Sequence, residues 1–256
     1  RIVKLVKYLI DMRKESIKSF VFNRARGLNK DKIEILKQKI ATKQINTPLD
    51  LALLIKNGNF KHIVLEIGSG YGNTAVKFAS DNKDTLYIAC EVYIKGLVNT
   101  FEKITDAKID NLFLYSKDAI EFCNEIREYN KNNELKILFD KIFILYPDPW
   151  HKTKHHKRRI FNLQNISLFH EILHYKDGNE LFFVTDHNSY KEWALSIILQ
   201  DMQSKQQKFS WVANNHDDFN NPPDWWVETK FELKAKTEGR VPIYIKLCPI
   251  SYQSKS

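Results

Sequence analysis

Five short hydrophobic runs recur through the middle of the chain, at residues 62–67, 85–90, 111–115, 141–146 and 180–185. Each run is apolar at nearly every position and lacks the alternation of apolar and polar residues that marks a half-exposed strand. Amphipathic stretches with helical spacing follow the runs, near residues 74–80, 95–107, 118–129, 160–175 and 189–204. Apolar strands that alternate with helices predict a parallel sheet covered on both faces. We therefore expect an open α/β fold that binds its ligands at the carboxyl ends of the strands.

The first 57 residues follow a different pattern, which predicts helices. Apolar residues recur at helical spacing over 2–10 and again over 31–40. Thr47, Pro48 and Asp50 form an N-cap, a first-turn proline and a capping acid, which predict a helix that ends at Asn57. We expect a basic helical arm at 1–57, a body at 58–250 that carries the sheet, and a tail at 251–256.

Composition narrows the class of protein. The 256 residues, 43% hydrophobic and 28% charged, suit a globular chain with a sizeable core. No apolar run approaches the roughly 18 residues that a membrane span needs, so we expect no membrane partner. Cys90, Cys123 and Cys248 are odd in number and widely spaced, which favours a reducing cytoplasm over a disulfide framework.

The positive charge is concentrated in two places. Residues 1–43 hold 13 Lys and Arg against 4 Asp and Glu, which matches the net charge of +9 for the whole chain. Residues 151–159 (HKTKHHKRR) add five cations within a stretch, 149–170, that has no acid. These clusters predict a surface for a polyanion, and the alternative is a solvated lysine-rich face. We expect no metal at the histidines of this run, because the surrounding cations repel a divalent ion.

A glycine loop follows the first strand run, at residues 68–72 (GSGYG), with Glu66 just before it. Glycines allow a tight turn and a close approach to a ligand. The spacing is shorter than the GxGxxG of dinucleotide sites and is common in adenosylmethionine sites. Glu91 and Asp118 follow the next two strands, where a ribose and an adenine amino group would be bound. Each acid alone could instead be a helix cap, and the loop a structural turn.

Residues 146–150 (YPDPW) follow the fourth strand run. Two prolines restrict the backbone around Asp148 and remove two amide donors, so we expect a rigid loop that directs Asp148 and Trp150 away from the sheet edge. Such a loop predicts a binding or catalytic site. The sequence contains no Walker A loop, GxSxG elbow or HExxH pair, which leaves phosphoryl transfer, acyl transfer and zinc hydrolysis without support.

The run PDPWHKTKHHKRR closely resembles the signature of the bacterial tRNA (guanine-N7)-methyltransferases. Residues 19–28 (SFVFNRARGL) resemble the basic lead-in of that family, residues 65–72 its cofactor loop, residues 185–190 with Trp193 its TD-Y-W segment, and residues 229–232 (TKFE) its substrate motif. The likeness spans about residues 19–247. Residues 239–244 (GRVPIY) depart from the GHGVWD-like ending of many members, which leaves the last strand and any subunit contact there open.

The resemblance implies the class I adenosylmethionine-dependent methyltransferase fold, a Rossmann-like, mostly parallel, doubly wound sheet with a last antiparallel strand. It implies S-adenosylmethionine as cofactor and methyl transfer to N7 of a guanine in the tRNA variable loop, at position 46 in tRNA convention. The implied cofactor residues are Glu66, Gly68, Ser69, Gly70, Glu91, Asp118, Ala119 and Asp148, with Asp148 also catalytic. The implied substrate contacts are Lys152, Asp186, Thr229, Lys230, Phe231 and Glu232. The implied RNA contacts are Lys154, His155, His156, Lys157, Arg158 and Arg159.

The chemistry of such a transfer needs alignment more than proton removal. Guanine N7 carries an in-plane lone pair, so no base is required, and carboxylates such as Asp148 and Asp186 would offset the positive charge that appears on the purine. Two alternatives remain at this stage, an adenine or cytosine amino-group methyltransferase that uses residues 147–150 as a DPPY-like loop, and a tRNA-binding protein without catalysis. The sequence leaves open whether the protein is a monomer or a homodimer.

Overall fold

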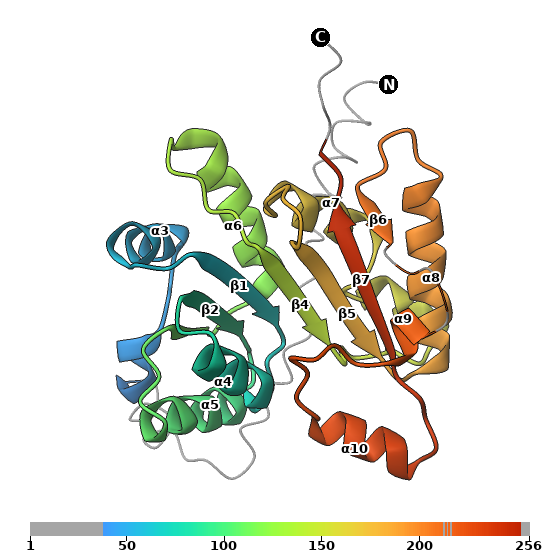
Figure 1. The fold of residues 1–256 in the computed structure, drawn as a ribbon, viewed down its shortest axis with the longest axis horizontal. Helices are drawn as coiled ribbons and strands as arrows, with labels where there is room; N and C mark the ends of the chain where they lie inside the picture. The colour runs from blue at the N-terminus through green and yellow to red at the C-terminus, as the bar shows by residue number, and fades with distance from the viewer. Residues whose placement is uncertain (1–37, 212, 214, 216, 252–256) are drawn as a thin grey trace.

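The computed structural model describes residues 38–211, 213, 215 and 217–251 (Figure 1). The helix predicted at 2–10, most of the helix predicted at 31–40 and the basic lead-in at 19–28 lie outside the described residues. The described residues form one seven-stranded sheet with helices on both faces.

The sheet has the strand order β3-β2-β1-β4-β5-β7-β6. The first five strands of this order pair in parallel, and β7 pairs antiparallel with both β5 and β6. In Figure 1, the arrow of β7 points opposite to those of β1, β4 and β5. The predicted α/β fold, mostly parallel and doubly wound with a last antiparallel strand, is confirmed. The strands are β1 (His62–Ile67), β2 (Thr85–Cys90), β3 (Leu112–Tyr115), β4 (Lys141–Leu145), β5 (Glu180–Thr185), β6 (Phe209–Trp211) and β7 (Ile243–Pro249).

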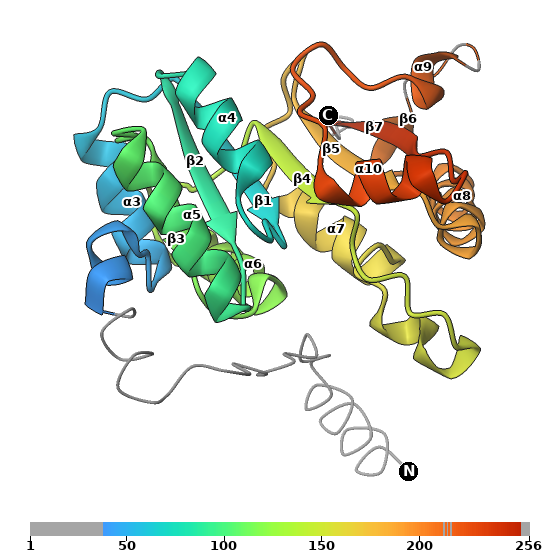
Figure 2. The ribbon, with the colours of Figure 1, turned by 90° about the horizontal axis from the view of Figure 1, so that it is seen from below.

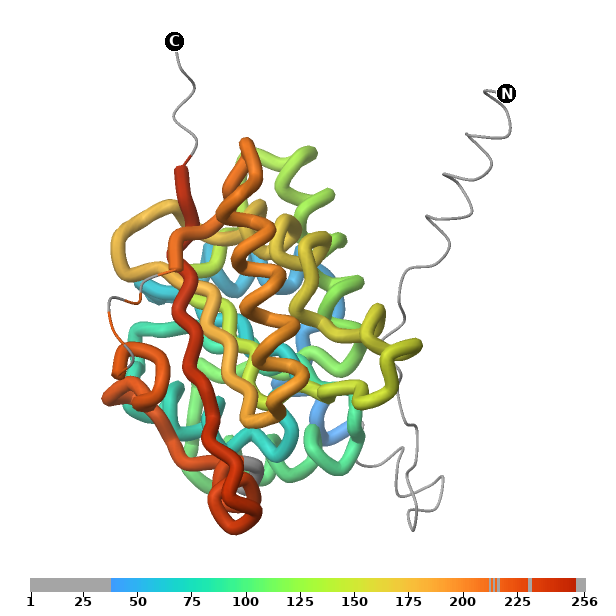
Figure 3. Tube along the Cα trace, turned by 90° about the vertical axis from the view of Figure 1, so that its right-hand side faces the viewer, coloured from blue at the N-terminus to red at the C-terminus, as the bar shows by residue number. Residues whose placement is uncertain are grey.

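The helices divide into two layers by the core into which they pack. One core lies under α3 (Pro48–Asn57), α6 (Ala119–Asn132), α7 (Leu163–Glu171) and α8 (Asn188–Met202). The other core lies under α4 (Asn73–Asp81) and α5 (Ile94–Asp106), and the partly buried Trp225 and Trp226 pack against it. Figure 2 shows both layers from below, and Figure 3 views the molecule from the side on which β7 lies. Shorter helices are η1 (Ala41–Lys43), η2 (Thr153–Arg158), α9 (Asp217–Asn220) and α10 (Lys230–Thr237).

The apolar runs become strands because both of their faces are covered. Every residue of β2 and of β5 is buried, as expected for central parallel strands. Helix α3 begins at the predicted cap, where the Thr47 side chain accepts a hydrogen bond from the Asp50 amide. Leu51 and Ala52 of α3 pack into the same core as the strands, so the boundary predicted at residue 57 does not separate two cores. Within the residues described, no helix is long and apolar enough to cross a bilayer.

Candidate active site

The acids expected at the site lie at one edge of the sheet. Glu66 is next to last in β1, and Glu91 directly follows β2. Asp118 and Asp148 each follow their strands, β3 and β4, after two intervening residues, and Asp186 directly follows β5. Because β3, β2, β1, β4 and β5 are parallel neighbours, their carboxyl ends bring all five acids to the same edge. Helix α10 lies beyond this edge (Figure 1).

The glycine loop leaves space for a ligand. Gly68 and Gly70 have φ of 77° and 56°, in the left-handed region that favours glycine, and a Cβ added at either would meet no atom within 4 Å. Between them, the buried Ser69 hydroxyl has no hydrogen-bond partner among the described residues. The loop and Glu66 line a pocket together with Tyr146 and Thr229. An unpartnered donor and two open glycines fit a cofactor that the backbone approaches closely.

Glu91 holds this loop in place. Its carboxylate accepts hydrogen bonds from the Gly70 amide and from the amides of Val92 and Tyr93, each at 2.7 Å. Burial raises its pKa, the three amide bonds oppose that change, and the nearby Asp148 charge adds to it. A ribose bound here would share a carboxylate that already orders the glycine loop, a second function that the spacing of the sequence did not reveal.

Glu66 is the most deeply buried acid of this edge, with 2% of its surface exposed. The Tyr87 hydroxyl donates a hydrogen bond of 3.0 Å to its carboxylate. Burial raises the pKa of Glu66 to about 7, the bond from Tyr87 opposes the change, and the neighbouring Glu91 adds to it. Glu66 therefore titrates near neutrality, where a bound cation would favour its ionised form.

Asp118 has the capping geometry that its sequence context allowed. Its Oδ1 accepts hydrogen bonds from the amides of Ile120 and Glu121 at the start of α6, at 2.8 and 3.1 Å. Ala119, the first residue of α6, therefore lies at the amino end of a helix that faces the ligand edge. Capping and contact with an adenine amino group are compatible, because each oxygen of a carboxylate can accept more than one hydrogen bond.

Residues 146–150 form a strained loop around Asp148. Tyr146 and Trp150 have φ of 49° and 45°, in the left-handed region that costs non-glycine residues about 1–2 kcal/mol each. Pro147 and Pro149 lie between these residues and the exposed Asp148. The Asp148 carboxylate makes no hydrogen bond or ion pair with another described residue. The prolines predicted a rigid loop, but the two left-handed residues were not predictable, because neither is glycine or asparagine.

One of the predicted RNA contacts is wrong on the evidence of burial. Arg159 has only 1% of its surface exposed, and its guanidinium binds groups inside the protein, so RNA phosphates cannot reach it. The other predicted contacts lie on the surface. Lys152, Lys154 and Lys157 are exposed, while His155, His156 and Arg158 are partly exposed. Arg158 lies over the Trp150 ring, 4.9 Å from its centroid.

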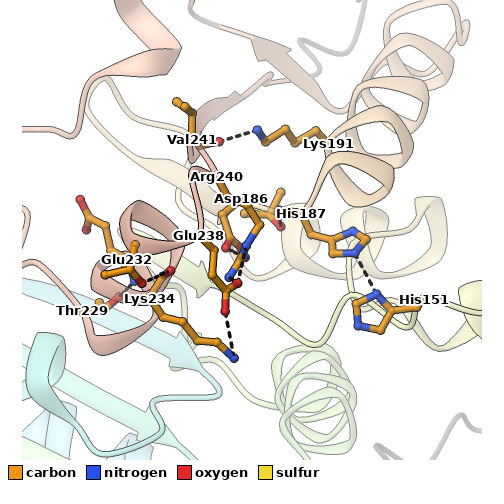
Figure 4. Close-up of polar contacts among 12 residues, drawn as sticks. His151, Asp186, His187, Lys191, Thr229, Glu232, Lys234, Glu238, Arg240 and Val241 are labelled. Atoms are coloured by element: carbon orange, nitrogen blue, oxygen red, sulfur yellow. Dashed lines mark hydrogen bonds and ion pairs between the residues drawn. The ribbon is translucent and has the colours of Figure 1, made fainter.

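Asp186 forms an ion pair with Arg240, which also pairs with Glu238 (Figure 4). Arg240 belongs to the segment that departs from the family pattern, so that segment supplies the cation partner of a predicted substrate contact. Beside this pair, His151 Nδ1 lies 2.8 Å from His187 Nε2, which joins the loop after β4 to the loop after β5. Burial lowers the pKa of His187, and His151 and nearby cations lower it further, which favours a neutral ring.

The predicted substrate motif at residues 229–232 begins α10. The Thr229 hydroxyl caps the helix by accepting from the Glu232 amide at 3.1 Å, and Thr229 also lines the pocket of the glycine loop. The Glu232 side chain is 4% exposed and accepts hydrogen bonds from Trp226 and Tyr244. Its carboxylate therefore anchors α10 to the last strand. The side chains of Lys230 and Phe231 lie outside the described residues.

No group of three or more potential metal ligands occurs among residues 38–251 where the structure describes them.

Comparison with known proteins identifies relatives. The model of a family described as "Putative methyltransferase" matches residues 61–244. The tRNA (guanine-N(7)-)-methyltransferase of Jannaschia sp. (strain CCS1) is 34% identical over 78% of this chain and 76% of its own length. The protein of the same name from Bartonella henselae is 32% identical over 93% of this chain and 98% of its own. A solved structure titled as that of an antibiotic-related methyltransferase has a TM-score of 0.57 and 15% identity, covers 82% of this chain and 98% of its own, and supports the fold alone.

Proposed function

The chain belongs to the family of tRNA (guanine-N7)-methyltransferases, and from this membership we propose that it transfers a methyl group from S-adenosylmethionine to N7 of a guanine in tRNA. The observation that carries the proposal is the position of Asp148. Its exposed carboxylate has no hydrogen bond or ion pair with another described residue and lies close enough to Glu91 to raise the pKa of that residue. In the chain it precedes the exposed Lys152, Lys154 and Lys157.

The cofactor would occupy the pocket of the glycine loop. S-adenosylmethionine, when bound, supplies an electrophilic methyl group on a positively charged sulfur. Gly68 and Gly70 offer open backbone, Ser69 offers an unpartnered hydroxyl, and Glu91 and Asp118 offer carboxylate oxygens at the ends of β2 and β3. These groups bind and orient, and the buried Glu66, whose pKa is raised to about 7, would ionise more readily beside the positively charged sulfur.

The chain supplies charge stabilisation rather than a base. Guanine N7 has no proton to lose, so a carboxylate near the ring acts by offsetting the positive charge that the base acquires. Asp148 meets this requirement, because it is exposed and has no cation partner among the described residues. Asp186 is already paired with Arg240, so its charge is largely offset and its role is to hold the base by hydrogen bonding.

The RNA would approach over the basic loop. Lys152, Lys154 and Lys157 are exposed in the segment that follows Asp148, where they can contact phosphates and bring the reactive base to the sheet edge. We propose the variable loop of tRNA as the region that carries the target guanine, and the cytoplasm as the location of the reaction. Three free cysteines, two of them buried, are compatible with that reducing compartment.

Methyl transfer to unmodified tRNA transcripts tests the proposal. Purified protein and tritiated S-adenosylmethionine should label tRNA, and borohydride followed by aniline should cleave the labelled strand at one guanine of the variable loop. A transcript with adenine at that position is the matched control and should remain unlabelled. Label in an adenine or cytosine amino group would favour the amino-group methyltransferase, and cofactor binding without any transfer would favour the non-catalytic tRNA-binding protein.

A further inference from the structure

Arg159 is the largest side chain that the described structure buries completely, and it lies beside the loop that carries Asp148. Its Nε donates to the carbonyl of Pro149 at 2.9 Å. One terminal nitrogen donates to the carbonyl of Ser189 at 2.9 Å, and the other donates to the Ser189 hydroxyl at 2.9 Å. That second nitrogen also contacts His156 Nε2 at 3.1 Å, which must accept because a guanidinium has no acceptor.

These bonds connect three separate segments of the site. Pro149 belongs to the strained loop after β4, His156 to the 3-10 helix η2, and Ser189 to the first turn of α8, just after Asp186 and His187. The guanidinium also lies 4.9 Å from the ring centroid of Tyr190 and 5.4 Å from that of Trp193. No acid forms an ion pair with Arg159 among the described residues, so its partners are neutral groups that its planar fork must fit.

The hydrogen bond from Arg159 to the Pro149 carbonyl is made directly before a strained residue. Trp150, with φ of 45°, begins at the peptide whose carbonyl Arg159 binds. Strained backbone of this kind persists only where its surroundings hold it. Arg158 lies over the Trp150 ring, so two successive arginines contact the same turn, one at the ring of Trp150 and the other at the carbonyl of Pro149.

We propose that Arg159 is a positioning residue that locks the 146–150 loop against α8 and so sets the place of the Asp148 carboxylate relative to Asp186. It does this through neutral partners, and it does not contact RNA. The same bonds make the basic helix η2 part of the lock, because His156 and Arg159 flank Lys157 and Arg158. This assignment rests on the proposed methyl transfer only for its effect on rate, since the lock itself is a property of the free protein.

The experiment compares Arg159→Lys with Lys157→Ala, an exposed residue of η2 two positions before Arg159, and with Lys205→Ala, an exposed cation beyond α8. Arg159→Lys keeps the charge and loses the planar fork. We expect it to lower kcat at saturating tRNA by roughly tenfold or more, while the salt dependence of tRNA binding keeps its wild-type slope. Lys157→Ala should instead flatten that slope by about one charge and act mainly on KM. Lys205→Ala should match wild type in both measurements.

Hydrogen–deuterium exchange of the peptide over residues 146–152, in free protein, measures how firmly the 146–150 loop is held and does not depend on enzymatic activity. We expect faster exchange in Arg159→Lys than in Lys157→Ala. Guanidinium ion added to Arg159→Ala should restore part of the methyl-transfer rate. Wild-type exchange together with wild-type kcat in Arg159→Lys would overturn the proposal. A weaker salt dependence of tRNA binding in Arg159→Lys would also overturn it. If the Arg159 variants do not fold, Ser189→Ala must show the same faster exchange, and its absence overturns the proposal. Wild-type protein that forms no N7-methylguanine refutes the methyl-transfer proposal and leaves the exchange result to decide on the lock.

Discussion

Replacing Glu66 by Gln should stabilise the free protein at alkaline pH. Glu66 is buried and its pKa is raised from 4.5 to about 7, mainly by burial. Each pKa unit corresponds to about 1.4 kcal/mol, so the ionised carboxylate destabilises the folded state by about 3 kcal/mol at pH 8. Gln keeps the shape and can still accept the hydrogen bond from Tyr87, and it removes the charge.

The sign of the pH dependence follows from proton binding. Between pH 4.5 and 7 the folded state keeps a proton on Glu66 that the unfolded chain has lost, so the contribution of the acid to stability falls as pH rises through this window. In Glu66→Gln the stability does not fall in this window, because glutamine carries no titrating group. Its advantage in the free energy of unfolding should be about 2–3 kcal/mol at pH 8 and below about 1 kcal/mol near pH 5.

Urea unfolding of both proteins without cofactor, at pH 5 and pH 8, measures the effect. The matched control is Glu180→Gln, a carboxylate that is likewise buried, at 3% exposed, but has Lys141 at 2.7 Å and Lys246 at 3.3 Å. Because it breaks charged contacts, that change should destabilise the protein by about 1.5–3 kcal/mol at both pH values. Equal stability changes for Glu66→Gln at pH 5 and pH 8 would show that the charge of Glu66 is not suppressed, and would refute the reasoning.

Three further predictions concern the site. Glu91→Ala should weaken cofactor binding roughly tenfold or more in calorimetry, because it removes a ribose acceptor and the acceptor of the Gly70 amide; unchanged affinity would remove the ribose assignment. Asp148→Asn should lower the single-turnover rate by roughly a hundredfold with little change in tRNA affinity or Tm, since the exposed carboxylate has no bonded partner among described residues; a wild-type rate would deprive it of a catalytic role. Lys154→Ala combined with Lys157→Ala should reduce the slope of log affinity against log salt by about two, whereas Lys205→Ala should leave it unchanged; an unaltered slope in the double variant would contradict the phosphate contacts.

The arrangement of the sheet and the gathering of the acids could be predicted from local patterns. A strand that is apolar at every position must be covered on both faces, and helices between such strands force them to run parallel. Parallel neighbours then place whatever follows each strand at one common edge. Glu66, Glu91, Asp118, Asp148 and Asp186 reach that edge for this reason alone. Two prolines likewise predicted a loop of restricted backbone around Asp148.

The partners of those residues depended on contacts between distant segments. Arg158 and Arg159 are adjacent cations in one basic run, and only the docking of η2 against α8 decides that the first lies on the surface and the second is buried. Asp186 pairs with Arg240, just before β7, and Glu232 accepts a hydrogen bond from Tyr244, within β7. Strand β7 pairs with β5 although it lies more than fifty residues later in the chain. A pattern of three or four residues specifies a helix face, a strand or a turn. Which side chain is buried and paired depends on free energies that exist only once the segments have packed together.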